Sequence, residues 1–162
     1  MERKDYPITA AVRFLREKEV NFKPHVYVYE EHGGAHHAAS VLKIPEHVVI
    51  KTLVMATDSH RPFLVLTHGD CEVSAKQLDR VMGVKHVVPC DVLAAQKHTG
   101  YLVGGISPFD TRKQMPVYAE ATVFTLERIY INGGKRGFLV EMDPLDLRRA
   151  LPTVEVEVAL QK

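Results

Sequence analysis

The sequence has little net charge, few cysteines and no long apolar run, and each absence excludes a class of protein. A formal net charge of +1 over 162 residues argues against a protein that coats nucleic acid without specificity. The apolar runs are strand-sized, far short of the roughly 20 residues that a membrane helix needs. Cys71 and Cys90 are too few for a disulfide framework or a cysteine-rich zinc site. We therefore expect a reduced, cytoplasmic protein without membrane contact.

The remaining composition, 46% hydrophobic and 25% charged residues, is that of a globular chain with one core. Its length predicts a single domain over residues 1–162. Short strands interrupted by helices predict the α+β class, with a mixed, curved or barrel-like sheet flanked by helices. Helices are expected at 10–19, 37–43, 74–83, 91–100 and 143–151, and strands at 22–30, 48–56, 63–67, 84–88, 117–119, 128–131 and 138–142.

Lys51 is the only charged residue in the apolar run 48–56. A strand that is apolar on both faces is normally buried on both faces, so this ammonium needs water, an anionic partner or a bound ligand. One interpretation is a strand near a sheet edge, with the ammonium extended to solvent. The other is a lysine that lines a pocket and donates hydrogen bonds to a carbonyl or a phosphate.

Two glycine-rich segments could also bind a ligand. Gly104-Gly105-Ile106-Ser107-Pro108 would let the backbone approach an oxyanion or a phosphate, although a tight turn explains a glycine pair equally well. The segment 132–137 predicts a hairpin turn, whose Lys135 and Arg136 either bind phosphate or are simply solvated. Neither segment has the pattern of a nucleotide-binding P-loop.

No motif for a protein nucleophile or a metal centre is present. His32 and His36 have the i, i+4 spacing of a helical metal site, but two glycines separate them and the acidic residue of that motif is missing. We predict that the loop with His32, His36 and His37 holds no metal. If the protein is an enzyme, its catalysis should be electrostatic or assisted by the substrate itself.

Three segments resemble the YbaK/EbsC family of aminoacyl-tRNA editing domains. The run 95–108, followed by Gly133-Gly134-Lys135-Arg136-Gly137, is similar to that family's glycine motifs, and Lys51-Thr52-Leu53 matches its strand lysine. The opening 8–15 resembles its first helix. The similarity covers nearly the whole chain and is greatest to the stand-alone branch, which deacylates Cys-tRNA(Pro).

The resemblance implies a pocket for the aminoacylated 3′-end of tRNA that needs neither metal nor cofactor. It makes Lys51 the essential lysine, in contact with the terminal adenosine or the ester carbonyl. The N–H of Gly104, helped by Gly105, would receive the carbonyl oxygen, while the substrate supplies the attacking group. Other implied substrate contacts are Tyr27, Thr52, Thr99, Gly105, Ile106, Ser107, Pro108, Asn132 and Gly133. Implied tRNA phosphate contacts are Lys97, Arg112, Lys113, Lys135 and Arg136.

Departures from the family pattern leave the amino acid that is removed open. Asn132 stands where that branch has serine, Leu139 lies where an acidic residue is usual, and either Tyr27 or Tyr29 is the pocket tyrosine, with Tyr27 favoured. The leading hypothesis is a Cys-tRNA(Pro) deacylase that acts in trans, with prolyl-tRNA synthetase as a candidate partner. The alternatives are removal of alanine or another small amino acid, and a non-catalytic module that binds tRNA or nucleotide. Residues 76–136 hold 9 basic and 5 acidic residues, which fits binding of one tRNA end.

Overall fold

The computed structural model describes residues 5–161, in which eight strands form one mixed sheet. The path through the sheet runs β1, β8, β7, β2, β3, β6, β9, and β5 pairs with β2 beside this path. The bounds are β1 (Lys23–Val26), β2 (Val49–Thr57), β3 (Pro62–His68), β5 (Val87–Pro89), β6 (Val117–Glu120), β7 (Ile129–Lys135), β8 (Phe138–Met142) and β9 (Val154–Val156). A separate pair joins β4 (Cys71–Val73) to β10 (Ala159–Gln161).

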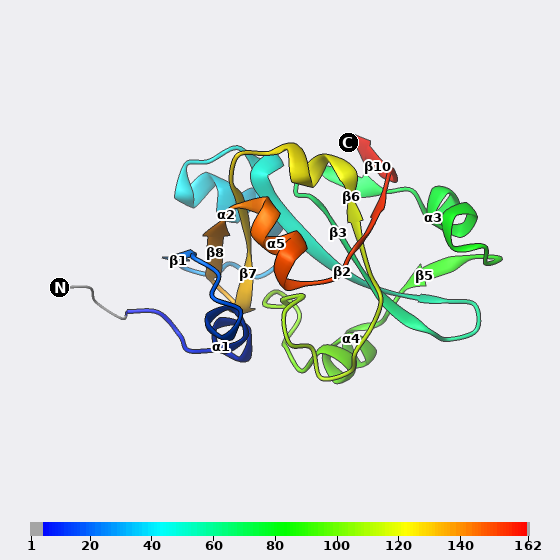
Figure 1. The fold of residues 1–162 in the computed structure, drawn as a ribbon, viewed down its shortest axis with the longest axis horizontal. Helices are drawn as coiled ribbons and strands as arrows, with labels where there is room; N and C mark the ends of the chain where they lie inside the picture. Colours follow the sequence, from blue (N-terminus) through cyan, green and yellow to red (C-terminus); the bar gives the residue numbers. More distant parts are fainter. Residues whose placement is uncertain (1–4, 162) are drawn as a thin grey trace.

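Helices flank this sheet, which confirms the predicted α+β class (Figure 1). They are α1 (Ala10–Glu17), α2 (Gly34–Leu42), α3 (Ala75–Met82), α4 (Val92–Thr99) and α5 (Pro144–Ala150), with 3₁₀ turns η1 (Glu46–Val48) and η2 (Ala121–Thr125). Thr9, Ser74, Asp91 and Asp143 cap four of these helices as their sequence positions predict, because each side-chain oxygen accepts a first-turn backbone N–H. In residues 5–161 no helix is long and apolar enough to cross a bilayer.

The β2–β3 hairpin lies at the centre of the core. On one face of β3, Leu64 and Leu66 pack into a cluster with residues of α1, α4, α5, β7 and β8. On the other face, Phe63 and Val65 pack with Leu78 of α3 and with residues of β5 and β9. Full burial of such side chains contributes about 1.5–3 kcal/mol each, so the hairpin provides a rigid base for any residue that projects from it.

Several element boundaries differ from the sequence predictions. β1 ends at Val26 and not near Glu30, because its partner strand begins at the paired residue Phe138. α2 begins at Gly34 and not at His37. β7 continues to Lys135 through a register shift, in which Asn132 Oδ1 accepts the backbone N–H groups of Gly134 (2.6 Å) and Lys135 (3.1 Å). The predicted hairpin is present, but its turn is confined to Arg136 and Gly137, and residues 132–135 form a bulged strand end.

The sheet forks along β2. Val49 and Ile50 pair in parallel with β7, whereas the segment Met55–Thr57 pairs antiparallel with β5 on the same side. Between these two pairings β2 has β3 on one side only, although the Val54 carbonyl accepts the Cys90 N–H at 2.9 Å. Figure 1 shows β7 and β5 at opposite ends of the long strand β2. Lys51 lies at this fork, on a strand that is central in the sheet but has β3 on one side only at this position.

Candidate functional site

A cavity of about 380 Å³ opens at the fork, and Lys51 is part of its wall. Its lining comes from β2, from α2 and the segment before it, from the loop that follows α4, and from β7 and β8. The lining residues are Tyr27, Tyr29, Glu30, His32, Gly34, Ala35, His37, Ala38, Val49, Ile50, Lys51, Thr52, Leu53, Val103, Gly104, Ile106, Asn132 and Leu139. A larger hollow of about 580 Å³ around Met115 and Leu151 has no lysine, histidine or cysteine in its wall, so we place the candidate site at the fork.

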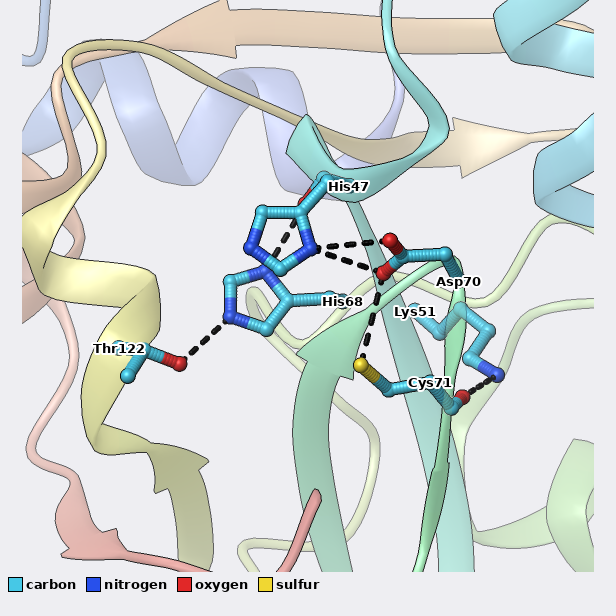
Figure 2. Close-up of polar contacts among 6 residues, drawn as sticks. All are labelled: His47, Lys51, His68, Asp70, Cys71 and Thr122. Atoms are coloured by element: carbon cyan, nitrogen blue, oxygen red, sulfur yellow. Dashed lines mark hydrogen bonds and ion pairs between the residues drawn. The ribbon is translucent and has the colours of Figure 1, made fainter. Parts of the chain in front are cut away.

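The ammonium of Lys51 is held by the segment that follows β3. Lys51 Nζ donates a hydrogen bond to the Cys71 carbonyl oxygen at 2.5 Å, as Figure 2 shows. The next residue, Thr52, also lines the cavity, and its buried Oγ1 has no hydrogen-bond partner in the described part of the chain. A buried hydroxyl without a partner is unusual in a folded protein, and a ligand in the cavity can supply one.

Gly104 faces this strand from the loop after α4. Its φ of +94° is a conformation that glycine adopts easily, and a Cβ there would lie 2.5 Å from Tyr29 Oη. The Gly104 carbonyl accepts a long hydrogen bond from Asn132 Nδ2 (3.4 Å). The Gly105 N–H already donates to the Leu102 carbonyl at 2.8 Å, so it is occupied within the loop. Gly104 is therefore the glycine that can present its backbone to a ligand.

Two tyrosines, not one, contribute to the cavity wall. Tyr27 packs against the ring of His37 at a centroid distance of 5.9 Å, and Tyr29 covers Gly104. Burial, followed by the neighbouring Tyr29, raises the pKa of Tyr27, so its hydroxyl stays protonated near neutral pH. The guanidinium of Arg136 lies 5.2 Å from the Tyr29 ring centroid, and its Nε donates to the Val103 carbonyl at 2.8 Å. Arg136 thus links the tyrosine to the glycine loop.

Several residues expected to contact substrate instead support the loop from within. Thr99 and Ser107 are 1% and 0% exposed. Thr99 Oγ1 donates to the Ala95 carbonyl within α4 and accepts the Tyr101 N–H, and Ser107 Oγ accepts the Phe109 N–H. Pro108 borders the larger hollow, outside the fork cavity. Gly105 packs against the Lys135–Arg136 backbone, and Gly133 packs under the Phe138 ring. Of the expected contacts, the cavity lining includes Tyr27, Thr52, Ile106 and Asn132, together with Lys51 and Gly104.

The five expected phosphate contacts are all exposed and form two groups. Lys135 and Arg136 lie at the β7–β8 turn beside the cavity, where Arg136 bonds to the glycine loop. Lys97 is on α4, and the backbone N–H groups of Arg112 and Lys113 donate to carbonyls at the end of that helix. Both groups therefore border the ends of the loop that holds Gly104.

Some lining residues were not expected from the sequence. The sequence drew attention to His37 only as one of three neighbouring histidines. In the structure its Nε2 forms a hydrogen bond with the Val28 carbonyl at 2.8 Å, and its ring packs on Tyr27. No serine or cysteine side chain lines the cavity among the described residues, and its hydroxyl groups are those of Thr52, Tyr27 and Tyr29. Among the described residues, one group of side chains lies close enough together to hold a metal ion. It consists of His47, Asp70 and Cys71, and none of the three lines the cavity.

The fold is shared with known editing domains. A solved structure described provisionally as a trans-editing enzyme for prolyl-tRNA synthetase superposes with a TM-score of 0.83. The match covers 96% of this chain and 99% of that one at 17% sequence identity, which shows a common fold.

Sequence comparison then identifies the family. The profile of the aminoacyl-tRNA editing domain matches residues 30–150, and the chain belongs to this family. It is 30% identical over 137 residues to the Enterococcus faecalis protein EbsC, which is described provisionally as a Cys-tRNA(Pro)/Cys-tRNA(Cys) deacylase, with 84% of both chains covered. It is also 28% identical over 100 residues to the proline–tRNA ligase of Streptococcus equi subsp. equi, covering 62% of this chain and 16% of that enzyme. The resemblance to the YbaK/EbsC group is thus confirmed.

Proposed function

We propose that the protein is a trans-acting deacylase that removes cysteine from Cys-tRNA(Pro). The observation that carries this proposal is the position of Lys51 and Gly104 on one cavity that contains no serine or cysteine of the protein. A cation and a backbone N–H can stabilise negative charge on an ester oxygen, whereas bond formation needs a nucleophile from elsewhere. A substrate that carries its own nucleophile meets this requirement.

The thiol of the cysteinyl group is that nucleophile. Its sulfur forms a bond to the ester carbonyl carbon, the bond from that carbon to the ribose oxygen breaks, and the thiol proton ends on the ribose oxygen. The products are tRNA with a free hydroxyl and a cyclic thioester of cysteine, which water then opens to cysteine. Lys51 and the Gly104 N–H stabilise the charge that develops on the carbonyl oxygen, so the protein contributes electrostatics and alignment.

The cavity wall favours a small side chain without charge. Val49, Leu53 and Ile106 contribute apolar surface, and Leu139 occupies the region where the family usually has an acidic residue. Burying an unpaired charge against such a wall is costly, whereas a thiol or a methyl group is tolerated. This supports cysteine first and alanine second as the amino acid removed.

The exposed basic residues on either side of the glycine loop support binding of the acceptor end. Lys135 and Arg136 lie on one side and Lys97, Arg112 and Lys113 on the other, and we assign them to phosphates near the 3′-end. A few phosphate contacts give weak binding that depends on salt. Such binding suits an enzyme that relies on prolyl-tRNA synthetase to select the tRNA, and the similarity to a proline–tRNA ligase is consistent with that partner.

The test is a deacylation panel with Cys-tRNA(Pro), Ala-tRNA(Pro), Cys-tRNA(Cys) and Pro-tRNA(Pro), measured with and without prolyl-tRNA synthetase. We expect release of cysteine from Cys-tRNA(Pro), slower release from the other three, and a lower KM when the synthetase is present. Hydrolysis of Ala-tRNA(Pro) but not of Cys-tRNA(Pro) would overturn the substrate assignment. Saturable tRNA binding without release of any amino acid would instead indicate a binding module.

A further inference from the structure

We propose that His47, Asp70 and Cys71 form a site for a divalent transition metal of the zinc type, with solvent as the fourth ligand. The inference does not depend on the deacylase activity, because none of the three residues lines the cavity at the fork. Three protein ligands and an open position are a common arrangement for zinc, which accepts nitrogen, oxygen and sulfur together.

The three side chains already converge. His47 Nδ1 lies 2.9 Å from Asp70 Oδ1 and 3.1 Å from Oδ2, and Cys71 Sγ lies 3.5 Å from Asp70 Oδ1. One ligand atom from each residue falls within 4.8 Å of the other two. Metal bonds of about 2.0–2.3 Å in a tetrahedral arrangement need ligand separations of roughly 3.3–3.8 Å. The Cys71–Asp70 pair already has such a separation, and the His47 and Asp70 ligand atoms must move slightly apart for a metal to bind between them.

The surrounding structure holds the His47 ring in place. His68 stacks on it with ring centroids 3.7 Å apart and an interplanar angle of 7° (Figure 2). His68 is 1% exposed, and both its nitrogens are bonded, Nδ1 to the His47 carbonyl (2.8 Å) and Nε2 to Thr122 Oγ1 (2.7 Å). Stacking on this buried ring, whose two nitrogens are both hydrogen-bonded, restricts the orientation of the His47 imidazole.

The turn that carries the other two ligands is pressed against η1. The Gly69 N–H donates to the Val49 carbonyl at 2.6 Å, and a Cβ on Gly69 would lie 2.7 Å from the Glu46 carbonyl oxygen. A glycine at this position lets the Asp70–Cys71 segment approach His47 closely. The site is thus built from two backbone segments in tight contact.

Solvent reaches the site from one side only. The His47 and Asp70 side chains are 40% and 38% exposed, whereas Cys71 is 3% exposed. Asp70 also borders a separate hollow of about 380 Å³, shared with His36, Glu46 and Gln161. The carboxylates of Asp70 and Glu46 give this entrance a negative potential that attracts a cation.

Binding requires protons to leave but no change of oxidation state. The metal replaces the thiol proton of Cys71, which passes to solvent, and His47 binds through Nδ1 with its remaining proton on Nε2. Thiolate and imidazole ligands favour zinc and cobalt over magnesium and calcium, which prefer oxygen ligands.

The experiment is a titration of chelator-treated protein with Co²⁺, followed by absorption spectroscopy, together with equilibrium dialysis against Zn²⁺. We expect one equivalent bound, with a sulfur-to-cobalt charge-transfer band and the intense visible bands of tetrahedral cobalt. Cys71→Ser should remove the charge-transfer band. His47→Gln removes a direct ligand, so it should weaken Zn²⁺ binding by at least about 100-fold, the upper range for loss of an outer-shell partner. Cys90→Ser and His36→Gln are the matched controls, which we expect to leave the spectrum and the stoichiometry unchanged.

A charge-transfer band that persists in Cys71→Ser, or that is lost in Cys90→Ser, would overturn the assignment. So would the absence of stoichiometric binding by the folded wild-type protein. Near-ultraviolet circular dichroism checks that each variant is folded. If the buried Cys71 does not tolerate serine, the more exposed His47 supplies the decisive variant, and unchanged affinity in folded His47→Gln would equally refute the site.

Discussion

Two segments lie around Lys51, and one contributes through its backbone whereas the other contributes mainly through its side chains. The loop from Gly100 to Pro108 reaches the cavity through backbone, with Gly104 at a φ of +94° beneath Tyr29. The segment from His68 to Cys71 acts through side chains packed on η1 and through one carbonyl that accepts the Lys51 ammonium. In the proposed function the first segment presents a backbone donor to the substrate, whereas the second holds the Lys51 ammonium through the Cys71 carbonyl. Substitutions in the loop should therefore affect catalysis directly, whereas substitutions in the turn should affect stability, metal binding and, through the position of Lys51, catalysis.

The largest expected effect is that of Lys51→Ala, which removes the ammonium that the Cys71 carbonyl holds at the cavity. Deacylation of Cys-tRNA(Pro) should fall by about 10²–10³, the range found when one oxyanion donor is removed. Lys51→Arg should restore little, because a planar guanidinium does not fit the position of a compact ammonium. Single-turnover assays measure the loss, with Lys23→Ala on β1 as the control lysine. Activity within tenfold of wild type in folded Lys51→Ala would contradict the role assigned to this residue.

Gly104→Ala tests the loop from Gly100 to Pro108 alone. The added Cβ would lie 2.5 Å from Tyr29 Oη and 3.1 Å from two ring atoms, at a φ that favours glycine, so we expect a 10- to 100-fold loss of activity. Gly104→Ala combined with Tyr29→Phe should recover part of the rate, because the nearest atom is then gone. Gly83→Ala is the control, since its φ is +67° but nothing lies within 4 Å of the new Cβ. An unchanged rate in Gly104→Ala would show that the loop does not present its backbone to substrate.

Gly69→Ala tests the segment from His68 to Cys71. Its Cβ would lie 2.7 Å from Ala35 Cβ and from the Glu46 carbonyl oxygen, and 2.9 Å from the Val49 carbonyl oxygen. Overpacking of this kind lowers the free energy of unfolding by about 1–3 kcal/mol, which denaturant titration measures. Addition of Ala35→Gly should recover only part of the loss, because the two carbonyl contacts remain. A variant of wild-type stability would show that the turn and η1 separate easily.

Glu141→Gln, in neither segment, should change stability without changing catalysis. Glu141 accepts hydrogen bonds from His25 Nε2 (2.8 Å) and Arg128 Nε (3.1 Å). Burial acts to raise the pKa of Glu141, but the bonds from His25 and Arg128 lower it below its ordinary 4.5. The ionised carboxylate therefore stabilises the fold above about pH 4.5, and this stabilisation is lost as the pH falls through the lowered pKa.

For Glu141→Gln we accordingly expect a loss of about 1–2 kcal/mol in the free energy of unfolding at pH 7. The difference from wild type should shrink as the pH is lowered toward 3. Chemical denaturation at several pH values makes the measurement, and the deacylation rate at pH 7 provides the internal control. A difference that is constant with pH would mean that the ionised state of Glu141 makes no contribution.

The smallest expected effect is that of Arg136→Gln, which removes the link between the tyrosine and the glycine loop. An exposed cation–π contact contributes about 0.5–1 kcal/mol, so KM should rise about two- to fivefold with kcat little changed. The salt dependence of KM should also become shallower, since one phosphate contact is lost. Lys76→Gln on α3 is the control for a change of net charge. A fall in kcat with KM unchanged would place Arg136 in the chemical step.

Four of the five helix starts and the central hairpin were predictable because local chemistry determines them. Thr9, Ser74, Asp91 and Asp143 cap as expected, and the apolar runs of β2 and β3 form strands. The strands β4, β9 and β10 were missed, because three-residue strands are determined by their partners and have no pattern of their own. The glycines of β7 suggested a turn, whereas tertiary pairing makes them a bulged strand.

The site was predictable to the extent that it depends on side chains in a recognisable motif. The family resemblance selected Lys51 and Gly104, and both line the cavity. It also selected Thr99 and Ser107, because a motif does not separate residues that touch a ligand from those that support the loop. The partner of the Lys51 ammonium, the Cys71 carbonyl, is a backbone group that no sequence pattern reveals. His47 and Asp70 likewise meet only through the contact of η1 with the turn.

The fork in the sheet also determines when the binding cavity can form during folding. The hairpin of β2 and β3 is local, but the pairing of Val49 with Tyr130 closes a long loop, and Leu139 completes the wall. Contacts between residues so distant in sequence form late, after local hairpins and helices. During synthesis Lys51 therefore emerges from the ribosome long before the segments that will surround it. A nascent chain that ends before β7 contains the lysine but no cavity, so the tRNA-end binding that we propose requires a nearly complete sheet.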